Sequence, residues 1–113
     1  MSNETKWTPG PWVAYENAED KCFYVAQQDG APYTPDYSDV CGLECRTWSG
    51  ERTIVQQANA HLIAAAPELY AALEDAVFRI RSTLILLECD DEFIARETEK
   101  ARAALAKARG EHQ

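Results

Sequence analysis

The sequence predicts an α+β fold in which a small antiparallel N-terminal sheet of about three strands precedes two to three C-terminal helices that form a helical hairpin. Two observations predict it. Residues before Gly50 are rich in aromatic, β-branched and turn-forming types, whereas those after it are mostly Ala, Leu, Glu and Arg. The apolar spacing also changes there, from short strand-like runs to the spacing of helices. We expect a single domain, residues 1–113, with a sheet portion over 7–50 and a helical portion over 53–110.

Three segments are expected to form the strands. Residues 12–15 and 22–26 are short runs of strand-forming residues separated by a polar stretch, which predicts a hairpin. Residues 40–48 form the third strand, with Gly42 expected to mark a β-bulge. A long loop, residues 27–39, joins it to the second strand. Because a sheet of three strands has exposed edges, it must pack on helices, on a partner or on both.

The first helix is expected over residues 53–65. Residues at helical spacing predict one apolar face, made of Val55, Ala58, Leu62 and Ala65. Pro67 has no backbone N–H to donate, so it ends this helix or opens the next one as its first residue.

The second helix, expected from Pro67 to about Cys89, is apolar on two sides. One stripe at helical spacing comprises Leu69, Leu73, Ala76, Ile80, Leu84 and Leu87. A second stripe, off that line, comprises Tyr70, Phe78 and Ile85. One stripe is enough for an intramolecular core, so the second indicates either complete burial or an oligomer interface. We therefore expect a homo-oligomer, a dimer or higher, built on the C-terminal helices over residues 67–109.

A third helix is expected to run to about Arg109. Residues 89–92 supply a turn, an N-cap and acids in the first turn, which favour the N-terminal end of a helix dipole. The residues expected to point inward are Ile94, Ala101, Leu105 and Ala108. Gly110 is expected to stop this helix.

The charge of the chain argues against several classes of partner. The net charge is −8, and both halves are acidic: residues 1–52 carry nine acids and four bases, and residues 53–113 carry ten and seven. Nonspecific nucleic-acid binding needs clustered Lys and Arg, so we expect no nucleic-acid partner. The N-terminus lacks the apolar region of a signal peptide, and the apolar run at residues 84–87, like every other apolar run of the sequence, is far too short to span a bilayer. We expect no membrane association and a cytoplasmic location.

The four cysteines, Cys22, Cys41, Cys45 and Cys89, are expected to be reduced thiols. Cys41 and Cys45 have a spacing found in zinc sites, and Cys22, Cys89 or His61 could complete four ligands. Structural zinc sites, however, usually bring two tight pairs of ligands, and this sequence has one. We expect no metal and no cofactor.

The sequence lacks the common catalytic motifs. It has no phosphate-cradling glycine loop, no G-x-S-x-G and no H-E-x-x-H. Of the two histidines, His112 lies in the terminal tail and His61 lies in the first predicted helix. A lone helical histidine is more often a surface or core residue than a general base. We expect no enzyme and no catalytic residue; a hydrolase acting through His61 and nearby acids is the weaker hypothesis.

Asn59 is the most informative polar residue of the helical portion. It lies between two alanines, where a better helix former would be more favourable by several tenths of a kcal/mol. This indicates a hydrogen-bond partner, which is either a cap, a group of the sheet or a ligand.

Arginines beside aromatic residues suggest where an anion would bind. Arg46 and Arg52 bracket Trp48, and Arg79 lies on the otherwise apolar second helix. Guanidinium forks bind phosphate bidentately, and aromatic rings stack on bases. Ion pairs with nearby acids are the alternative role of the helical arginines. We expect a small anionic nucleotide to bind where the third strand meets the first helix, at Arg46, Trp48, Arg52 and Asn59, with Arg79 added by a neighbouring copy.

Two segments carry a resemblance to known proteins. The chain has T-P-G-P-W at Thr8–Trp12 and A-N-A-H-L-I-A-A-A-P-E-L at Ala58–Leu69. In this order they resemble a family of small proteins common in phage and prophage genomes. The layout is also similar to that of the Thoeris anti-defence sponges, in which a sheet precedes interlocking helices.

The resemblance implies a phage-encoded oligomer that sequesters a nucleotide-derived immune signal in the host cytoplasm. One alternative is an interaction protein whose acidic surface binds a basic host protein. Another is a phage accessory protein without a small-molecule ligand.

Overall fold

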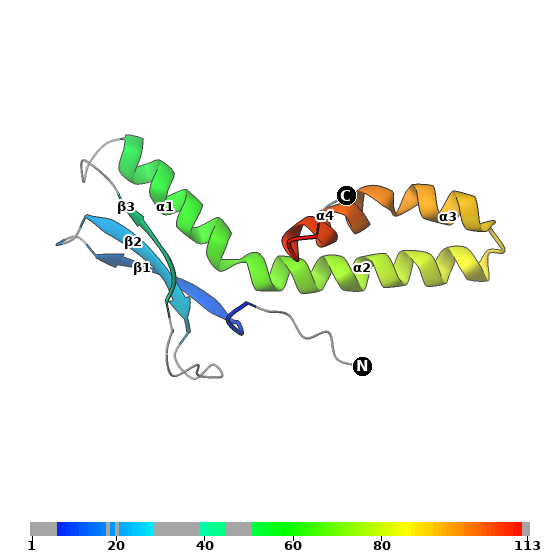
Figure 1. Cartoon of the computed structure of the whole chain (residues 1–113), viewed down its shortest axis with the longest axis horizontal. Helices are drawn as coiled ribbons and strands as arrows, with labels where there is room; N and C mark the ends of the chain where they lie inside the picture. The colour runs from blue at the N-terminus through cyan, green and yellow to red at the C-terminus, as the bar shows by residue number, and fades with distance from the viewer. Residues whose placement is uncertain (1–6, 18, 20, 29–38, 45–50, 112–113) are drawn as a thin grey trace. The chain divides into compact units, whose positions relative to one another are not determined.

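The computed structural model describes residues 7–17, 19, 21–28, 39–44 and 51–111 (Figure 1). The elements in chain order are β1 (Trp12–Asn17), β2 (Cys22–Gln27), β3 (Asp39–Glu44), α1 (Glu51–Ala64), α2 (Ala66–Leu86), α3 (Asp91–Glu97) and α4 (Glu99–Ala108). This order, an N-terminal sheet followed by helices, confirms the predicted α+β fold. The described residues divide into two compact units, Trp7–Glu68 and the part of the chain from Leu69 onward.

The sheet has the order β1-β2-β3, and both strand pairs are antiparallel. The predicted hairpin is confirmed, because every residue of β1 pairs with a residue of β2. Val25, in the middle of β2, pairs with Ala14 on one side and with Cys41 on the other. The predicted third strand is present as far as Glu44; its remaining positions, residues 45–48, lie outside the described residues.

The irregularity of β3 lies at Val40, and the prediction of a bulge at Gly42 is wrong. Val25 pairs with Cys41 and Ala26 pairs with Asp39, so Val40 is the extra residue between them. Gly42 instead pairs regularly with Tyr24, whose ring lies beside the glycine; a Cβ there would be 3.7 Å from two ring carbons. A glycine opposite an aromatic residue is a common way to pack a strand, which explains Gly42 without a bulge.

Helix α1 packs on one face of this sheet and contacts all three strands. Phe23 and Val25 of β2 and Ala60 of α1 form the buried core. Ile63 and Ala64 of α1 pack against it, together with the strand residues Trp12, Ala14, Val40, Cys41 and Leu43. Ala60 is fully buried, and its small side chain lets the helix backbone approach the larger residues of β2.

The predicted apolar face of the first helix is not the face that packs on the sheet. Val55, Ala58 and Leu62 are exposed, and Ala65 is only half-buried. Apolar residues lie on more than one side of α1, so their spacing did not define a single face. The side of α1 that packs on the sheet is instead the one that carries Ala60, because a small side chain fits over the large side chains of Phe23 and Val25.

The segment before β1 is tied to the sheet by side-chain hydrogen bonds. Trp12 donates from Nε1 to the carbonyl oxygen of Thr8 at 3.0 Å, and Gln27 donates from Nε2 to that of Pro9 at 3.1 Å. Gln27 is itself buried. These bonds hold the T-P-G-P-W segment at the end of the sheet.

The same segment lies against the start of α2. A Cβ on Gly10 would be 2.9 Å from Cβ of Pro67, which is closer than Cβ atoms approach in proteins. Pro67 lies in the first turn of α2, as predicted, where its missing N–H leaves no helical hydrogen bond unmade. The two segments that carry the family resemblance are therefore in contact.

The second compact unit contains most of α2, followed by α3 and α4, which run back alongside α2 as a helical hairpin (Figure 1). Helix α2 ends at Leu86, before the predicted Cys89, because Glu88 adopts a left-handed conformation with φ of 61°. The N–H of Glu88 donates to Ile85 and that of Cys89 to Leu84, the bond pattern of a Schellman motif. Asp90 then caps α3 by accepting a hydrogen bond from the N–H of Phe93 at 2.8 Å, which confirms the predicted cap in this turn.

The predicted third helix is divided in two at Thr98. This residue is buried, and its hydroxyl donates to the carbonyl oxygen of Ile94 at 2.9 Å. A threonine that bonds back to its own helix tends to bend it, and Thr98 has a non-helical backbone with φ of −107° and ψ of 4°. The described part of the chain thus has four helices, one more than the upper end of the prediction, because the third is divided.

The division at Thr98 also changes which residues point inward. Ile94 and Leu105 are buried as predicted, and Ala101 is half-buried, but Ala108 is exposed and Ala106 is buried instead. Gly110 ends α4 as predicted, with a φ of 82° that favours glycine. No helix in the described part of the chain has an apolar stretch long enough to cross a membrane.

Candidate functional site

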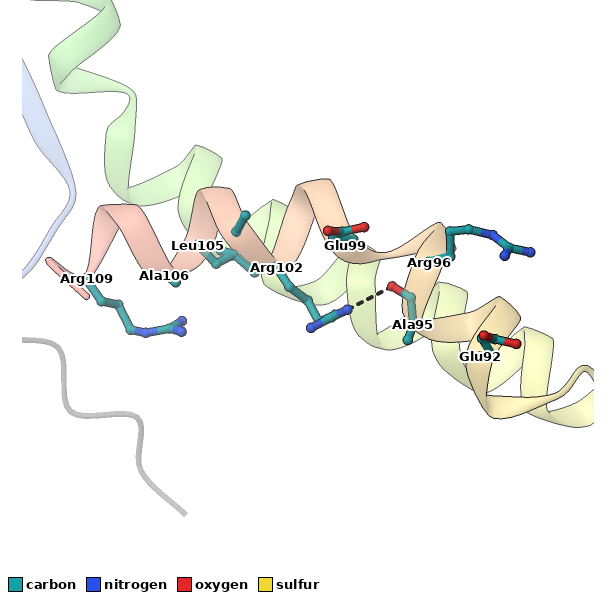
Figure 2. Close-up of a pocket in the computed structure, with 9 residues that line it drawn as sticks. Glu92, Ala95, Arg96, Glu99, Arg102, Leu105, Ala106 and Arg109 are labelled. Carbon is teal, nitrogen blue, oxygen red and sulfur yellow. Dashed lines mark hydrogen bonds between the residues drawn. The ribbon is translucent and has the colours of Figure 1, made fainter. Parts of the chain in front are cut away.

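One face of α3 and α4 forms an open groove of about 780 Å³ (Figure 2). Both helices contribute to it, because their residues at three- and four-residue spacing share one side. The lining residues are Glu92, Ala95, Arg96, Glu99, Arg102, Ala103, Leu105, Ala106 and Arg109. The alanines leave room along the helix surface, and the charged groups are three arginines and two glutamates.

Arg102 is held in place by acceptors of its own helix pair. Its Nε donates to Oγ1 of Thr98 at 3.0 Å, and its Nη2 donates to the carbonyl oxygen of Ala95 at 2.8 Å. Nη1 has no hydrogen-bond acceptor among the described residues. Two fixed nitrogens reduce the entropy lost when the third binds an anion, so this guanidinium is preorganised.

Arg109 extends from α4 in the same direction as Arg102 (Figure 2). It binds both carboxylate oxygens of Glu111, at 2.8 and 3.2 Å, and its Nη1 donates to the hydroxyl oxygen of Tyr70 at 3.0 Å. The hydrogen bonds to Glu111 raise the pKa of Arg109, and the same bonds lower the pKa of Glu111. Because this ion pair is exposed to water, it contributes little to stability.

The third arginine, Arg96, extends away from the other two (Figure 2). Its guanidinium carbon lies 5.9 Å from the centre of the Phe93 ring, within the range of a cation–π contact. Arg102 and Arg109 are therefore the two arginines of the groove that extend in the same direction.

The groove lies on the positive part of an acidic chain. Residues 99–109 carry four bases and one acid, whereas the rest of the chain carries seven bases and eighteen acids. The spacing of Arg102 and Arg109, seven residues apart, places both on one side of a helix. Sequence reasoning missed these residues, and the signal that could have identified them is this local excess of bases.

Three of the predicted ligand residues cannot be placed. Arg46 and Trp48 lie outside the described residues, and Arg52 belongs to α1 but its side chain also lies outside them. The pocket predicted where the third strand meets the first helix thus stays a prediction.

The other two predicted residues have partners close by in sequence. Asn59 is exposed on α1, and its Nδ2 donates to Oε1 of Gln56 at 3.1 Å. Arg79 forms an ion pair with Asp75 one turn earlier, at 2.7 Å, and its side chain is 75% exposed. Asn59 and Arg79 belong to different compact units, and their predicted roles in ligand binding stay predictions.

The described cysteines Cys22, Cys41 and Cys89 are free thiols, and Cys45 lies outside the described residues. Burial raises the pKa of the Cys41 thiol. Within the described part of the chain, no group of three or more His, Cys, Asp or Glu residues is placed to hold a metal ion.

Helix α2 exposes two of the three residues of the second predicted apolar stripe, while Tyr70 is half-buried. Phe78 is 69% exposed and Ile85 is 57% exposed, two turns apart on one side of the helix. The buried residue of α2 is Val77, which belongs to neither predicted stripe. Other large apolar side chains exposed on this helix are Leu69, Ile80 and Leu86.

Comparison with known proteins identifies a family. The model of the family described as Salmonella phage P22 protein Y8K6 matches residues 1–112, which is nearly the whole chain. No curated protein and no solved structure matches the chain. The match includes both signature segments and all the elements described above, and by it the chain belongs to the Salmonella phage P22 protein Y8K6 family.

Proposed function

We propose that this phage-family protein is a homo-oligomeric binding protein, not an enzyme, that sequesters a small anionic ligand of the nucleotide-derived class used as bacterial immune signals. The observation that carries the proposal is the groove on α3 and α4, where Arg102 and Arg109 extend in the same direction. A phage protein that binds such a signal without consuming it acts by stoichiometric capture.

The chemistry of the groove favours a phosphate-bearing ligand. Charge-assisted hydrogen bonds between guanidinium groups and phosphate are among the stronger polar contacts in proteins. Arg102 offers a donor without an acceptor among the described residues, and Arg109 can exchange Glu111 for a ligand oxygen. The exposed Phe78 and Ile85 support the oligomeric part of the proposal, because large apolar side chains this exposed commonly mark interfaces.

Calorimetry with cyclic dinucleotides and cyclic ADP-ribose isomers tests the proposal directly. We expect at least one of these compounds to bind the wild-type protein. Because one charge-assisted hydrogen bond is worth roughly 1.5–3 kcal/mol, Arg102→Ala should weaken binding by on the order of tenfold to a hundredfold.

Lys100→Ala is the matched control. Lys100 lies on the same helix and carries the same charge, but it does not line the groove. We expect this variant to bind within about twofold of the wild type, since exposed charges at a distance are largely screened. An equal loss in both variants would show that only overall charge matters.

A second pair of variants locates the ligand. Arg46→Ala and Arg52→Ala test the pocket predicted where the third strand meets the first helix. If these variants lose binding and Arg102→Ala does not, the ligand lies in that pocket. If no compound binds and mass spectrometry finds no co-purified ligand, the acidic chain is better explained as a protein that binds a basic host protein.

A further inference from the structure

The outward face of α1 is apolar and has no partner among the described residues of the chain. Ile54, Val55 and Leu62 are 65%, 54% and 64% exposed, and Ala58 between them is also exposed. Ile54, Ala58 and Leu62 are four residues apart, so they form one ridge along the helix. The opposite side of α1 packs on the sheet through Ala60 and Ile63.

The stretch that contains this ridge is free of net charge. Residues 53–67 contain no Asp, Glu, Lys or Arg, in a chain whose residues are 27% charged and whose net charge is −8. Two copies of so acidic a chain repel each other over most of their surface. A contact between copies is therefore most favourable where acids are absent, and α1 provides such a surface.

The sizes of the side chains along this ridge are symmetric about Ala58. A large side chain lies one turn before it, at Ile54, and another lies one turn after it, at Leu62. In an antiparallel pair of α1 helices, Ala58 meets Ala58 of the second copy at the centre, and Ile54 meets Leu62 of the second copy at each end. A small residue at the crossing point lets two helices approach to about 8 Å. A symmetric dimer needs a patch that complements itself in this way.

We propose that the Ile54–Ala58–Leu62 face of α1 is a self-association surface, on which a second copy of the chain docks its own α1 in the antiparallel direction. Asn59 lies beside Ala58 on the flank of this face, so its amide lies near Asn59 of the second copy. This gives Asn59 a role apart from ligand binding. The surface is distinct from the Phe78 and Ile85 stripe of α2, and the proposal does not depend on the anion groove.

Site-directed disulfide cross-linking tests whether a second copy of the chain docks on this face of α1. It also tests whether the two α1 helices run antiparallel. Ala58→Cys places two thiols at the centre of an antiparallel pair, within the Cα separation of about 4.4–6.8 Å that a disulfide needs. Mild oxidation should then give a covalent dimer on a non-reducing gel. The wild type, oxidised in parallel, gives the background from its native cysteines.

Ile54→Cys is the matched control. In an antiparallel pair the two copies of this position are separated by eight residues, or about 12 Å along the helix axis, so they should not cross-link. Ile54→Cys combined with Leu62→Cys should cross-link again, because these two positions face each other.

The outcomes are clear for a folded protein, which circular dichroism checks for each variant. Cross-linking by Ala58→Cys and by the double variant, but not by Ile54→Cys, supports the proposal. Equal cross-linking by Ala58→Cys and Ile54→Cys means a parallel or nonspecific contact and overturns it. No cross-linking above the wild type also overturns it and leaves the face to a different protein.

Discussion

Gly10 and Pro67 lie so close that a Cβ added to the glycine would be 2.9 Å from Cβ of the proline. A proline ring cannot swing away as the end of a long side chain can. The backbone of one segment must shift if Gly10 gains a side chain, and the sheet and the start of α2 are both affected.

We expect Gly10→Ala to lower the free energy of unfolding by about 1–3 kcal/mol, as overpacking does in other proteins. Urea denaturation followed by circular dichroism measures it. The control is Gly42→Ala, where the new Cβ meets the Tyr24 ring at an ordinary 3.7 Å. Similar losses in both variants would mean that strand propensity, and not the contact with Pro67, explains the effect.

Thr98→Val should also destabilise the protein. The substitution keeps the volume but removes the hydroxyl that donates to Ile94 and accepts from Arg102. Loss of these bonds in a buried position should cost about 1 kcal/mol in unfolding free energy. Thr83→Val, at an exposed site of α2, is the matched control and should change it by no more than about 0.5 kcal/mol. The groove variant Arg102→Ala should cost less stability in the Thr98→Val background than in the wild type, because one of its two hydrogen bonds is already lost there.

The exposed apolar side chains of α2 lead to a separate prediction about how copies of the chain associate. Phe78→Glu combined with Ile85→Glu should break the contact that α2 makes between copies and lower the mass of the assembly, because both side chains are more than half exposed and charged groups are unfavourable in an apolar interface. The separate α1 contact should be unaffected. Light scattering measures the mass, and circular dichroism follows the sheet. A monomeric wild type at micromolar concentration would refute the oligomer. Unfolding of the double variant would instead place these residues in an internal core.

The Arg109 and Glu111 pair predicts a specific dependence on pH. Bonding to Arg109 lowers the pKa of Glu111, so the pair stabilises the folded state above the ordinary glutamate pKa of about 4.3. This contribution is lost as the pH falls through the lowered value. We expect wild type and Glu111→Gln to differ slightly in urea midpoint at pH 7 and to converge once the pH falls below the lowered pKa of Glu111. A difference that grows on acidification would contradict the assignment.

The thiols provide the last prediction. Denatured protein without prior reduction should titrate close to four free thiols. In the native state Cys41 should react slowly near neutral pH, because burial raises its pKa and only the thiolate reacts. Cys22 is buried and should react slowly as well. Stoichiometric zinc in elemental analysis would contradict the expectation of a metal-free protein.

Local signals in the sequence were enough to predict where the strands and helices lie, but not which face of a helix packs against the rest of the protein. The strand pairing, the cap at Asp90 and the stop at Gly110 depend on neighbouring residues, and all three were predicted. The inward face of α1 depends on which residue fits over Phe23 and Val25, which spacing along one helix does not contain. The division at Thr98 arises from one hydroxyl bond in a segment with good helical spacing.

The groove on α3 and α4 shows the same limit, because sequence reasoning did not identify the residues that line it. Sequence reasoning favoured arginines beside aromatic residues, and Arg46 and Trp48 lie outside the described residues. In the sequence, Arg102 is one of four basic residues in residues 99–109, and its neighbours in sequence do not distinguish it. Its preorganisation comes from Thr98 and the carbonyl of Ala95, and neither acceptor is apparent until the helix is divided.

The concentration of positive charge in residues 99–109 has a consequence for the speed of capture. An anion that approaches this acidic protein is repelled by most of its surface and attracted by one face. Attraction of this kind mainly raises the association rate, and salt screens it over a Debye length of about 10 Å at 0.1 M. In the proposed complex, dissociation depends instead on the short contacts that Arg102 and Arg109 would make with the ligand. A rise in ionic strength should therefore slow the arrival of an anionic ligand much more than it hastens its departure.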